Sequence, residues 1–310
     1  MANNEVHFRE AEQRLWDSVG VTPIERRVHL GRTGVSVRVL EVGEGPTVVF
    51  VHGATNGGSS WASLAARLDG FRCVLLDRPG CGLSDPLPAR FEDIDELDAF
   101  ADRMIVELLD ELGLETAHVV ATSFGGYFTL RAAAASPDRF GRIVEMGWSF
   151  GAPILHVPLL MRLGSVPLFA RLATRMPLNE RAVRAMLRQI GLRGALKSGR
   201  FDQHSVDWYL ALLRDTGTMR NELAVAPRII LPIRGLNERV LLQPSLLAAI
   251  RTPIQFLWGE DDPFGGAETA RRFVEQLPSA QLELMPGVGH APWMDDPDHA
   301  ATVVRRFLDE

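Results

Sequence analysis

Short apolar runs alternate with longer amphipathic stretches along much of this chain, and this alternation most restricts how it can fold. The runs at 47–51, 72–76 and 118–121 are mostly apolar, as strands buried on both faces are. Between them, 61–68 and 94–112 repeat apolar residues with the period of a helix. Strands that alternate with helices form βαβ units, whose strands lie parallel in one sheet. The sequence therefore predicts an α/β core.

The alternation continues beyond residue 121, stops, and resumes near the C-terminus. The further helices are predicted at 124–135, 267–276 and 297–308, and the further strands at 142–146, 253–258 and 281–284. Since both stretches share one pattern, we predict a single core domain formed by 1–147 and 252–310.

The intervening segment, 148–251, has a different pattern. Helical periodicity is found near 159–174, 180–190 and 203–215, with Pro and Gly between these stretches and no segment typical of a strand. We therefore predict an inserted helical cap. Apolar cap residues that are left over after packing would line a pocket above the core.

The N-terminal part precedes the main alternation. Residues 1–20 form a predicted helical extension that packs on the body of the protein, with three apolar residues near one face: Phe8, Leu15 and Val19. Two strands, 24–30 and 35–42, follow around a glycine-containing turn, which predicts a hairpin.

Charge and cysteine content exclude several classes of partner. The 33 Lys and Arg against 39 Asp and Glu give a net charge of -6, with no long basic run, so we expect no nucleic-acid partner. Two cysteines, Cys73 and Cys81, are too few for a disulfide framework, and no Cys/His spacing indicates a metal or another cofactor. The charged N-terminus and the lack of long apolar runs predict a cytoplasmic protein without a membrane span. The expected partner is a small-molecule substrate.

The segment 119–126 joins a predicted buried strand directly to a helix through Ser123. A serine in so sharp a turn needs small residues two positions away on each side, and Ala121 and Gly125 meet this need. The usual pattern is G-x-S-x-G. Ala121 stands in place of the first glycine and is still a small residue. The turn is typical of a nucleophile elbow, and the helix start at Phe124 offers a free N–H group to an oxyanion.

Two further glycine-rich loops follow strands. In 50–58, the Ala54 N–H is the predicted second oxyanion donor, and His52 is expected to brace the turn by hydrogen bonding. In 75–85, Asp77 and Arg78 are expected to form a buried pair that organises the loop near the elbow.

An acid and a base are predicted after the last two strands. Glu260, Asp261 and Asp262 are adjacent, and the spacing from Gly259 favours Asp262 over Asp261 and then Glu260. His290 lies in a glycine-rich turn that we expect to be exposed and mobile. The order Ser, Asp, His, each just after a predicted strand, predicts a catalytic triad.

With these motifs the chain resembles the α/β-hydrolase superfamily over nearly its whole length. The segments that carry the resemblance are 52–53, 77–84, 123–126, 259–262 and 289–290. The resemblance implies an eight-stranded, mostly parallel sheet with one antiparallel early strand, flanked by helices, and a helical cap inserted after the sixth strand.

These residues predict a cofactor-independent serine hydrolase that forms an acyl-enzyme. The apolar cap favours a small or medium, hydrophobic carboxylic ester. A serine nucleophile argues against epoxide hydrolases and haloalkane dehalogenases, which use an aspartate. The alternative is a C–C bond hydrolase of the meta-cleavage type, although such enzymes commonly carry an aromatic residue where Ala291 stands. Peptidase, lactonase, thioesterase and acyltransferase activities, and a non-enzymatic small-molecule sensor, also remain open.

Overall fold

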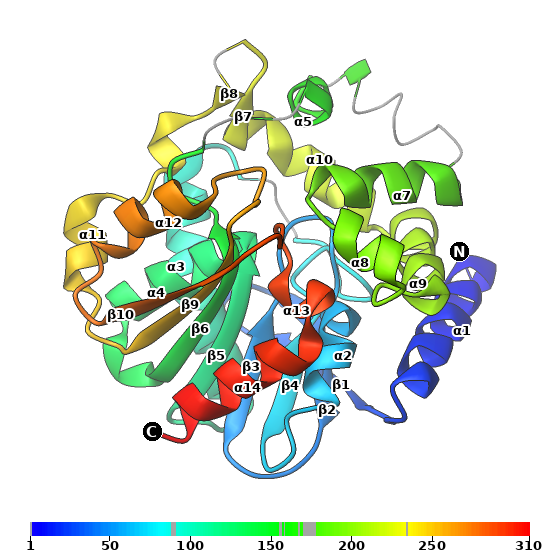
Figure 1. The fold of residues 1–310 in the computed structure, drawn as a ribbon, viewed down its shortest axis with the longest axis horizontal. Helices are drawn as coiled ribbons and strands as arrows, with labels where there is room; N and C mark the ends of the chain where they lie inside the picture. Colours follow the sequence, from blue (N-terminus) through cyan, green and yellow to red (C-terminus); the bar gives the residue numbers. More distant parts are fainter. Residues whose placement is uncertain are drawn as a thin grey trace.

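A central sheet lies between two layers of helices in the computed structural model (Figure 1). The structure describes residues 2–87, 91–154, 157, 159–166, 168–169, 178–233 and 235–310. Eight strands form the sheet, in the order β1-β2-β4-β3-β5-β6-β9-β10. Only β2 runs against the others, since it pairs antiparallel with both β1 and β4. The predicted fold class is confirmed.

The strands are short and mostly buried. Their bounds are β1 Ile24–Leu30, β2 Val35–Val42, β3 Thr47–Val51, β4 Arg72–Leu76, β5 Ala117–Ser123, β6 Phe140–Ser149, β9 Ile254–Gly259 and β10 Ala280–Met285. The first four have the predicted bounds, whereas β6 extends beyond both predicted ends. The carboxyl ends of all strands except β2 lie at one edge of the sheet. The loops that follow β3, β5, β9 and β10 therefore meet at this edge.

Helices cover both faces of the sheet. One face packs against α3 Ile94–Glu111, α4 Phe124–Ala135, α11 Pro244–Ala249 and α12 Ala267–Val274. The other packs against α1 Ala2–Ser18, α2 Ala62–Ala65, α13 Pro292–Asp295 and α14 Pro297–Leu308. Two 3-10 turns, η1 Gly58–Trp61 and η2 Pro137–Arg139, precede α2 and β6. The helices α11 and α13 are short and were not predicted, because fewer than two turns leave no clear periodicity.

Between β6 and β9 the described chain is mainly helical (Figure 1). Its elements are α5 Leu159–Gly164, α7 Glu180–Gln189, α8 Arg193–Ser198, α9 Gln203–Asp215, α10 Thr218–Ile229, the 3-10 turn η3 Glu238–Val240 and α11. A two-residue ladder joins β7 Ile230–Leu231 to β8 Gly235–Leu236, so the expectation of no strand here was wrong. The last part of the helix predicted at 159–174 lies outside the described residues. None of the helices described has the length and hydrophobicity that a membrane span needs.

The N-terminal helix α1 is held to the core by a buried ionic network. Glu12 and Asp77 both bond Arg38, with Nη1 of Arg38 at 3.0 Å from Oε1 of Glu12 and 3.3 Å from Oδ2 of Asp77. The three side chains are almost fully buried. Ser59 also donates to Oε1 of Glu12 at 2.6 Å. The helix therefore supports the start of η1, next to the predicted oxyanion loop.

Candidate active site

Ser123 ends β5 in a backbone conformation that few residues adopt. Its φ of 52° and ψ of -119° turn the chain sharply into α4. A methyl group at Gly125 would overlap the Val51 carbonyl oxygen, so that position requires glycine. Ala121, at the departure from the usual pattern, is fully buried. Such strain at a strand end is typical of a nucleophile elbow, in which the serine is presented above the sheet.

Asp262 and His290 are brought together at the same edge. Nδ1 of His290 lies 2.8 Å from Oδ2 of Asp262. Trp148 N–H donates to the same oxygen at 2.9 Å, and Phe264 N–H donates to Oδ1 at 3.0 Å. Asp262 is buried, whereas the neighbouring Asp261 is exposed. The carboxylate is thus held in one orientation with a negative charge directed at the imidazole.

The environment of His290 differs from the expected exposed turn. Only 8% of the residue is accessible, and its backbone N–H donates to the Ile190 carbonyl at 3.1 Å. The Phe264 ring meets the imidazole edge to face at 4.6 Å between centroids. The sequence could not show this burial, because the covering residues come from distant segments.

Strand geometry shows how Ser123 relates to this pair. Both β5 and β9 pair with β6, so the ends that carry Ser123 and Asp262 are two strands apart. With adjacent strands about 4.8 Å apart, β5 and β9 lie roughly 10 Å apart at the edge where the Asp262–His290 pair is held. Gly147, two residues before the end of β6, has a φ of 75°, and a side chain there would overlap the His290 carbonyl. This glycine lets the His290 loop approach the sheet.

An aromatic wall lies beside the predicted triad residues. The Trp148 ring is tilted against Phe264, at 5.4 Å between centroids, and meets Phe150 edge to face at 5.9 Å; Phe150 lies 5.2 Å from Phe124, next to Ser123. All four rings are buried. An apolar wall strengthens electrostatic interactions within the site and favours an apolar part of a substrate.

The loop predicted to hold an oxyanion lies against Ser123. A methyl group at Gly53 would be 3.0 Å from Cβ of Ser123. His52 is fully buried: its Nδ1 lies 2.8 Å from the Gly53 carbonyl, and its Nε2 accepts from Arg78 N–H at 3.0 Å. Burial and then the Arg78 charge lower the pKa of His52 well below its usual value, so the ring is neutral. The prediction that His52 braces the loop is confirmed.

Asp77 and Arg78 are buried but do not pair with each other, so that expectation was wrong. Asp77 accepts from Gly58 N–H at 2.7 Å and from Arg38, whereas Arg78 donates to the His52 and Gly53 carbonyls. Adjacent residues in extended backbone point to opposite sides, and this separates the two side chains. Both still organise the loop, through different partners.

A buried acid that the sequence did not indicate lies under the elbow. Glu145 on β6 is fully buried, and neither its carboxyl oxygens nor Oγ of Ser149 has a hydrogen-bond partner among the described residues. Both side chains lie so close to Gly126 in α4 that a methyl group there would overlap them. Burial raises the pKa of Glu145 well above its usual value. Burial therefore favours the protonated, neutral form of this acid, which packs against α4.

This raised pKa predicts a pH-dependent stability. The unfolded chain releases the Glu145 proton near pH 4 to 5, while the folded chain keeps it. The contribution of Glu145 to the free energy of unfolding is therefore complete below that range and is lost as the pH rises. Relative to Glu145→Gln, the wild-type free energy of unfolding should fall by up to about 1.4 kcal/mol per pH unit. Urea unfolding between pH 4 and pH 8 measures this difference. Exposed Glu115→Gln is the control, and parallel curves for wild type and Glu145→Gln would refute the assignment.

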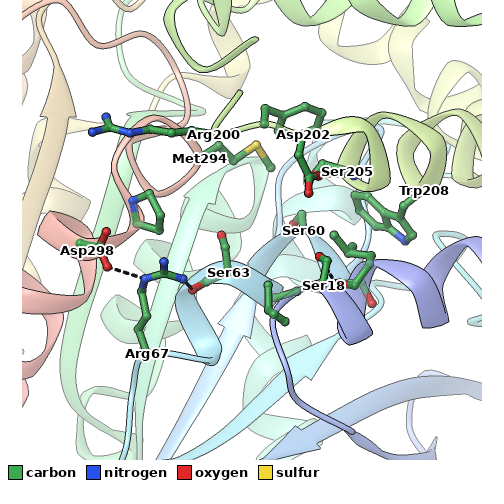
Figure 2. Close-up of a pocket in the computed structure, with 16 residues that line it drawn as sticks. Ser18, Ser60, Ser63, Arg67, Arg200, Asp202, Ser205, Trp208, Met294 and Asp298 are labelled. Atoms are coloured by element: carbon green, nitrogen blue, oxygen red, sulfur yellow. Dashed lines mark hydrogen bonds and ion pairs between the residues drawn. The ribbon is translucent and has the colours of Figure 1, made fainter. Parts of the chain in front are cut away.

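Figure 2 shows a separate cavity. It has a volume of about 210 Å³ and is lined by residues of α1, η1, α2, α9, α13 and the start of α14. Ser60, Ser63 and Trp208 contribute to its lining, and Arg67 spans one side with a 2.6 Å bond to Asp298 (Figure 2). None of the predicted site residues lines it. Within the described part of the chain, no three His, Cys, Asp or Glu side chains form a group that could hold a metal.

The fold and this site define a class of enzyme. A mostly parallel sheet that presents a strained serine after β5 and an Asp–His pair after β9 and β10 is the arrangement of a hydrolase with a nucleophile elbow. Residues 48–303 match the Alpha/beta hydrolase family. The chain belongs to this family.

Similar proteins include hydrolases named for 2-hydroxy-6-oxo-dienoates and an esterase. The 2-hydroxy-6-oxononadienedioate/2-hydroxy-6-oxononatrienedioate hydrolase 2 of Pseudomonas putida is 29% identical, over 91% of this chain and 94% of the relative. The structure of the 2-hydroxy-6-oxo-6-phenylhexa-2,4-dienoate hydrolase of a Rhodococcus strain has a TM-score of 0.78 at 22% identity, covering 94% and 100%. Naproxen esterase of Bacillus subtilis has a TM-score of 0.76 at 17% identity, covering 99% of each chain.

Proposed function

We propose that this chain is a serine hydrolase that cleaves a carbon–carbon bond beside a ketone in a 2-hydroxy-6-oxo-dienoic acid. The observation that carries the proposal is the Asp262–His290 hydrogen bond of 2.8 Å at the sheet edge where Ser123 ends β5. The substrate class is supported by the likeness to the Pseudomonas putida hydrolase along 91% of this chain. That likeness favours cleavage of a carbon–carbon bond, the alternative predicted from the sequence, over ester hydrolysis.

In the proposed first half-reaction, Ser123 adds to the ketone carbon while His290 takes its proton. Asp262 orients the imidazole through Nδ1 and stabilises the cation that forms. The N–H groups of Ala54 and Phe124 stabilise the oxyanion of the tetrahedral intermediate. These roles follow the usual division of labour in a Ser-His-Asp triad.

Cleavage of a carbon–carbon bond requires the departing carbon to carry the bonding electrons away. Moving the 2-hydroxyl proton to that carbon first gives a keto form, in which these electrons delocalise onto the C2 oxygen. Bond cleavage then leaves the acyl group on Ser123, and the proton held by His290 passes to the dienolate oxygen, so that a 2-hydroxydienoate leaves and His290 is neutral again. Water, activated by His290, attacks this ester and releases a carboxylic acid.

Ester hydrolysis is the second candidate, and two observations favour it. Ala291 stands where C–C hydrolases commonly have an aromatic residue. The aromatic wall formed by Trp148, Phe150 and Phe264 also suits an apolar acyl or alcohol group. An ester needs no proton transfer before cleavage, since an alkoxide leaves more readily than a carbanion.

A direct comparison of substrates tests the proposal. The purified protein is given 2-hydroxy-6-oxo-6-phenylhexa-2,4-dienoate, the corresponding nonadienedioate, and p-nitrophenyl esters from acetate to palmitate. We expect kcat/KM of about 10⁴ M⁻¹s⁻¹ or more for one of the dienoates, in the usual enzyme range, and a value at least about tenfold lower for every ester. Loss of the dienol absorbance measures the first reaction, and release of p-nitrophenolate measures the second.

Each other outcome has a definite meaning. Faster turnover of an ester than of both dienoates would replace the proposal by ester hydrolysis. Tight binding of a dienoate with one slow turnover would favour a sensor over an enzyme.

A further inference from the structure

Thr55, next to the proposed donor Ala54, is held in a backbone conformation that disfavours its side chain. Its φ is 49°, in the left-handed region, where β-branched residues are rare. Such a residue persists only when its surroundings constrain it. The contacts that constrain Thr55 therefore also determine where the preceding N–H group points.

One of these contacts comes from the helical insertion. Glu222 lies on α10, and its Oε2 accepts from Thr55 N–H at 3.2 Å. Its Oε1 accepts from Nη2 of Arg78 at 3.0 Å. The carboxylate is 13% exposed and so is largely withdrawn from water. A residue outside the core domain thus contacts the backbone of the oxyanion loop directly.

Arg78 extends this contact to the other side of Ala54. Its Nη2 donates to the Gly53 carbonyl at 2.9 Å, and its Nε donates to the His52 carbonyl at 3.0 Å. Burial has the largest single effect and acts to lower the pKa of Arg78, but the charge and hydrogen bond of Glu222 and the charge of Cys81 together outweigh it, so the pKa is raised. The guanidinium therefore stays charged in a buried position, with Glu222 as its counter-ion.

The two contacts fix the two peptide planes that meet at Ala54. The Gly53 carbonyl and the Ala54 N–H share one rigid peptide unit, so a bond to this carbonyl sets the direction of that N–H. The Thr55 N–H belongs to the next unit, which Glu222 holds. The Glu222–Arg78 pair thus restricts rotation on both sides of the proposed oxyanion donor.

We propose that Glu222 is a positioning residue that orients the Ala54 N–H for oxyanion binding, and that this donor is set only while α10 is seated on the core. The inference rests on the proposed function, since it takes Ala54 as a donor. Two other bonds seat the same helix: Asn221 donates to the Gly80 carbonyl at 2.8 Å, and Gly82 N–H donates to Thr218 at 2.9 Å. When the insertion docks on the core, Glu222 therefore reaches its position and the Ala54 N–H is oriented at the same time.

The test is Glu222→Gln, with Glu238→Gln on exposed η3 as the matched control. The amide keeps the size of the side chain but has a single acceptor oxygen and no charge for Arg78. Complete loss of an oxyanion donor costs about 10² to 10³ in kcat, so we expect a loss of about 10-fold to 100-fold in kcat with KM changed less than about threefold. Affinity for a trifluoromethyl ketone, which forms a tetrahedral oxyanion adduct with a serine, should fall in parallel.

Rates are normalised to the fraction of protein that a fluorophosphonate labels at completion, so partial unfolding does not imitate the effect. If Glu222→Gln does not fold, Glu222→Asp keeps the charge on a shorter side chain and should lower kcat and inhibitor affinity in the same way. Wild-type values of kcat and inhibitor affinity in the variant would overturn this inference alone. Absence of any adduct with the wild-type protein would overturn the proposed function as well.

Discussion

Ser123→Ala should lower kcat by about 10⁶-fold, the size of effect found when a triad serine is removed. The hydroxyl is the only group of this side chain that can form the acyl-enzyme, and alanine suits the small space at the turn. The φ of 52° already disfavours any side chain, so the variant should fold as the wild type does. Steady-state turnover of the preferred substrate measures the loss.

Covalent labelling provides an independent readout of the same variant. A fluorophosphonate probe should label the wild-type protein and Ser245→Ala, in which an exposed serine of α11 is changed, and should not label Ser123→Ala. Full labelling or wild-type turnover of Ser123→Ala would show that the nucleophile lies elsewhere.

Asp262→Asn should lower kcat by about 10⁴-fold. The carboxylate receives N–H groups on both oxygens, from Phe264 on Oδ1 and from Trp148 on Oδ2, which also meets His290. An amide must therefore direct its NH2 group either at the Phe264 N–H or at the imidazole, where it would favour the wrong tautomer. In both orientations the negative charge that stabilises the imidazolium is lost.

Asp261→Asn is the matched control, because Asp261 is adjacent and exposed. We expect its kcat to stay within about twofold of wild type, as surface substitutions have small effects. An equal loss of kcat in the two variants, or a loss of kcat in Asp261→Asn alone, would contradict the role of Asp262. Thermal unfolding of both variants separates loss of the acid from loss of the fold.

Much of the fold could be predicted because buried strands in this chain are short, apolar and bounded by turn residues. Runs such as 47–51 and 72–76 have the same bounds in sequence and structure. Of the elements missed in the insertion, α8 and the β7–β8 ladder are too short to show a period, whereas α10 has twelve residues and contains Pro227, a residue that usually interrupts a helix. Propensity and pattern are local, so they describe long elements better than short ones.

The candidate site shows a different limit. Ser123, Asp262 and His290 could be proposed because each follows a predicted strand, and parallel strands bring their carboxyl ends to one edge. The surroundings of Glu145 and Glu222 could not be predicted, since the residues that each side chain meets, Gly126 and Thr55, are distant in sequence. An isolated glutamate in a strand or a helix has no local pattern that distinguishes a buried residue from an exposed one.

The sequence by itself determined the α/β core, the position of the inserted segment and the order of serine, acid and base. These properties depend on local periodicity and on residue types at strand ends. Only the tertiary structure decided that His290 is buried, that Asp77 binds Arg38 while Arg78 binds Glu222, and that the insertion contacts the oxyanion loop. Burial and charge pairing depend on which distant segments the fold brings together, and a single sequence does not carry that information in any local pattern.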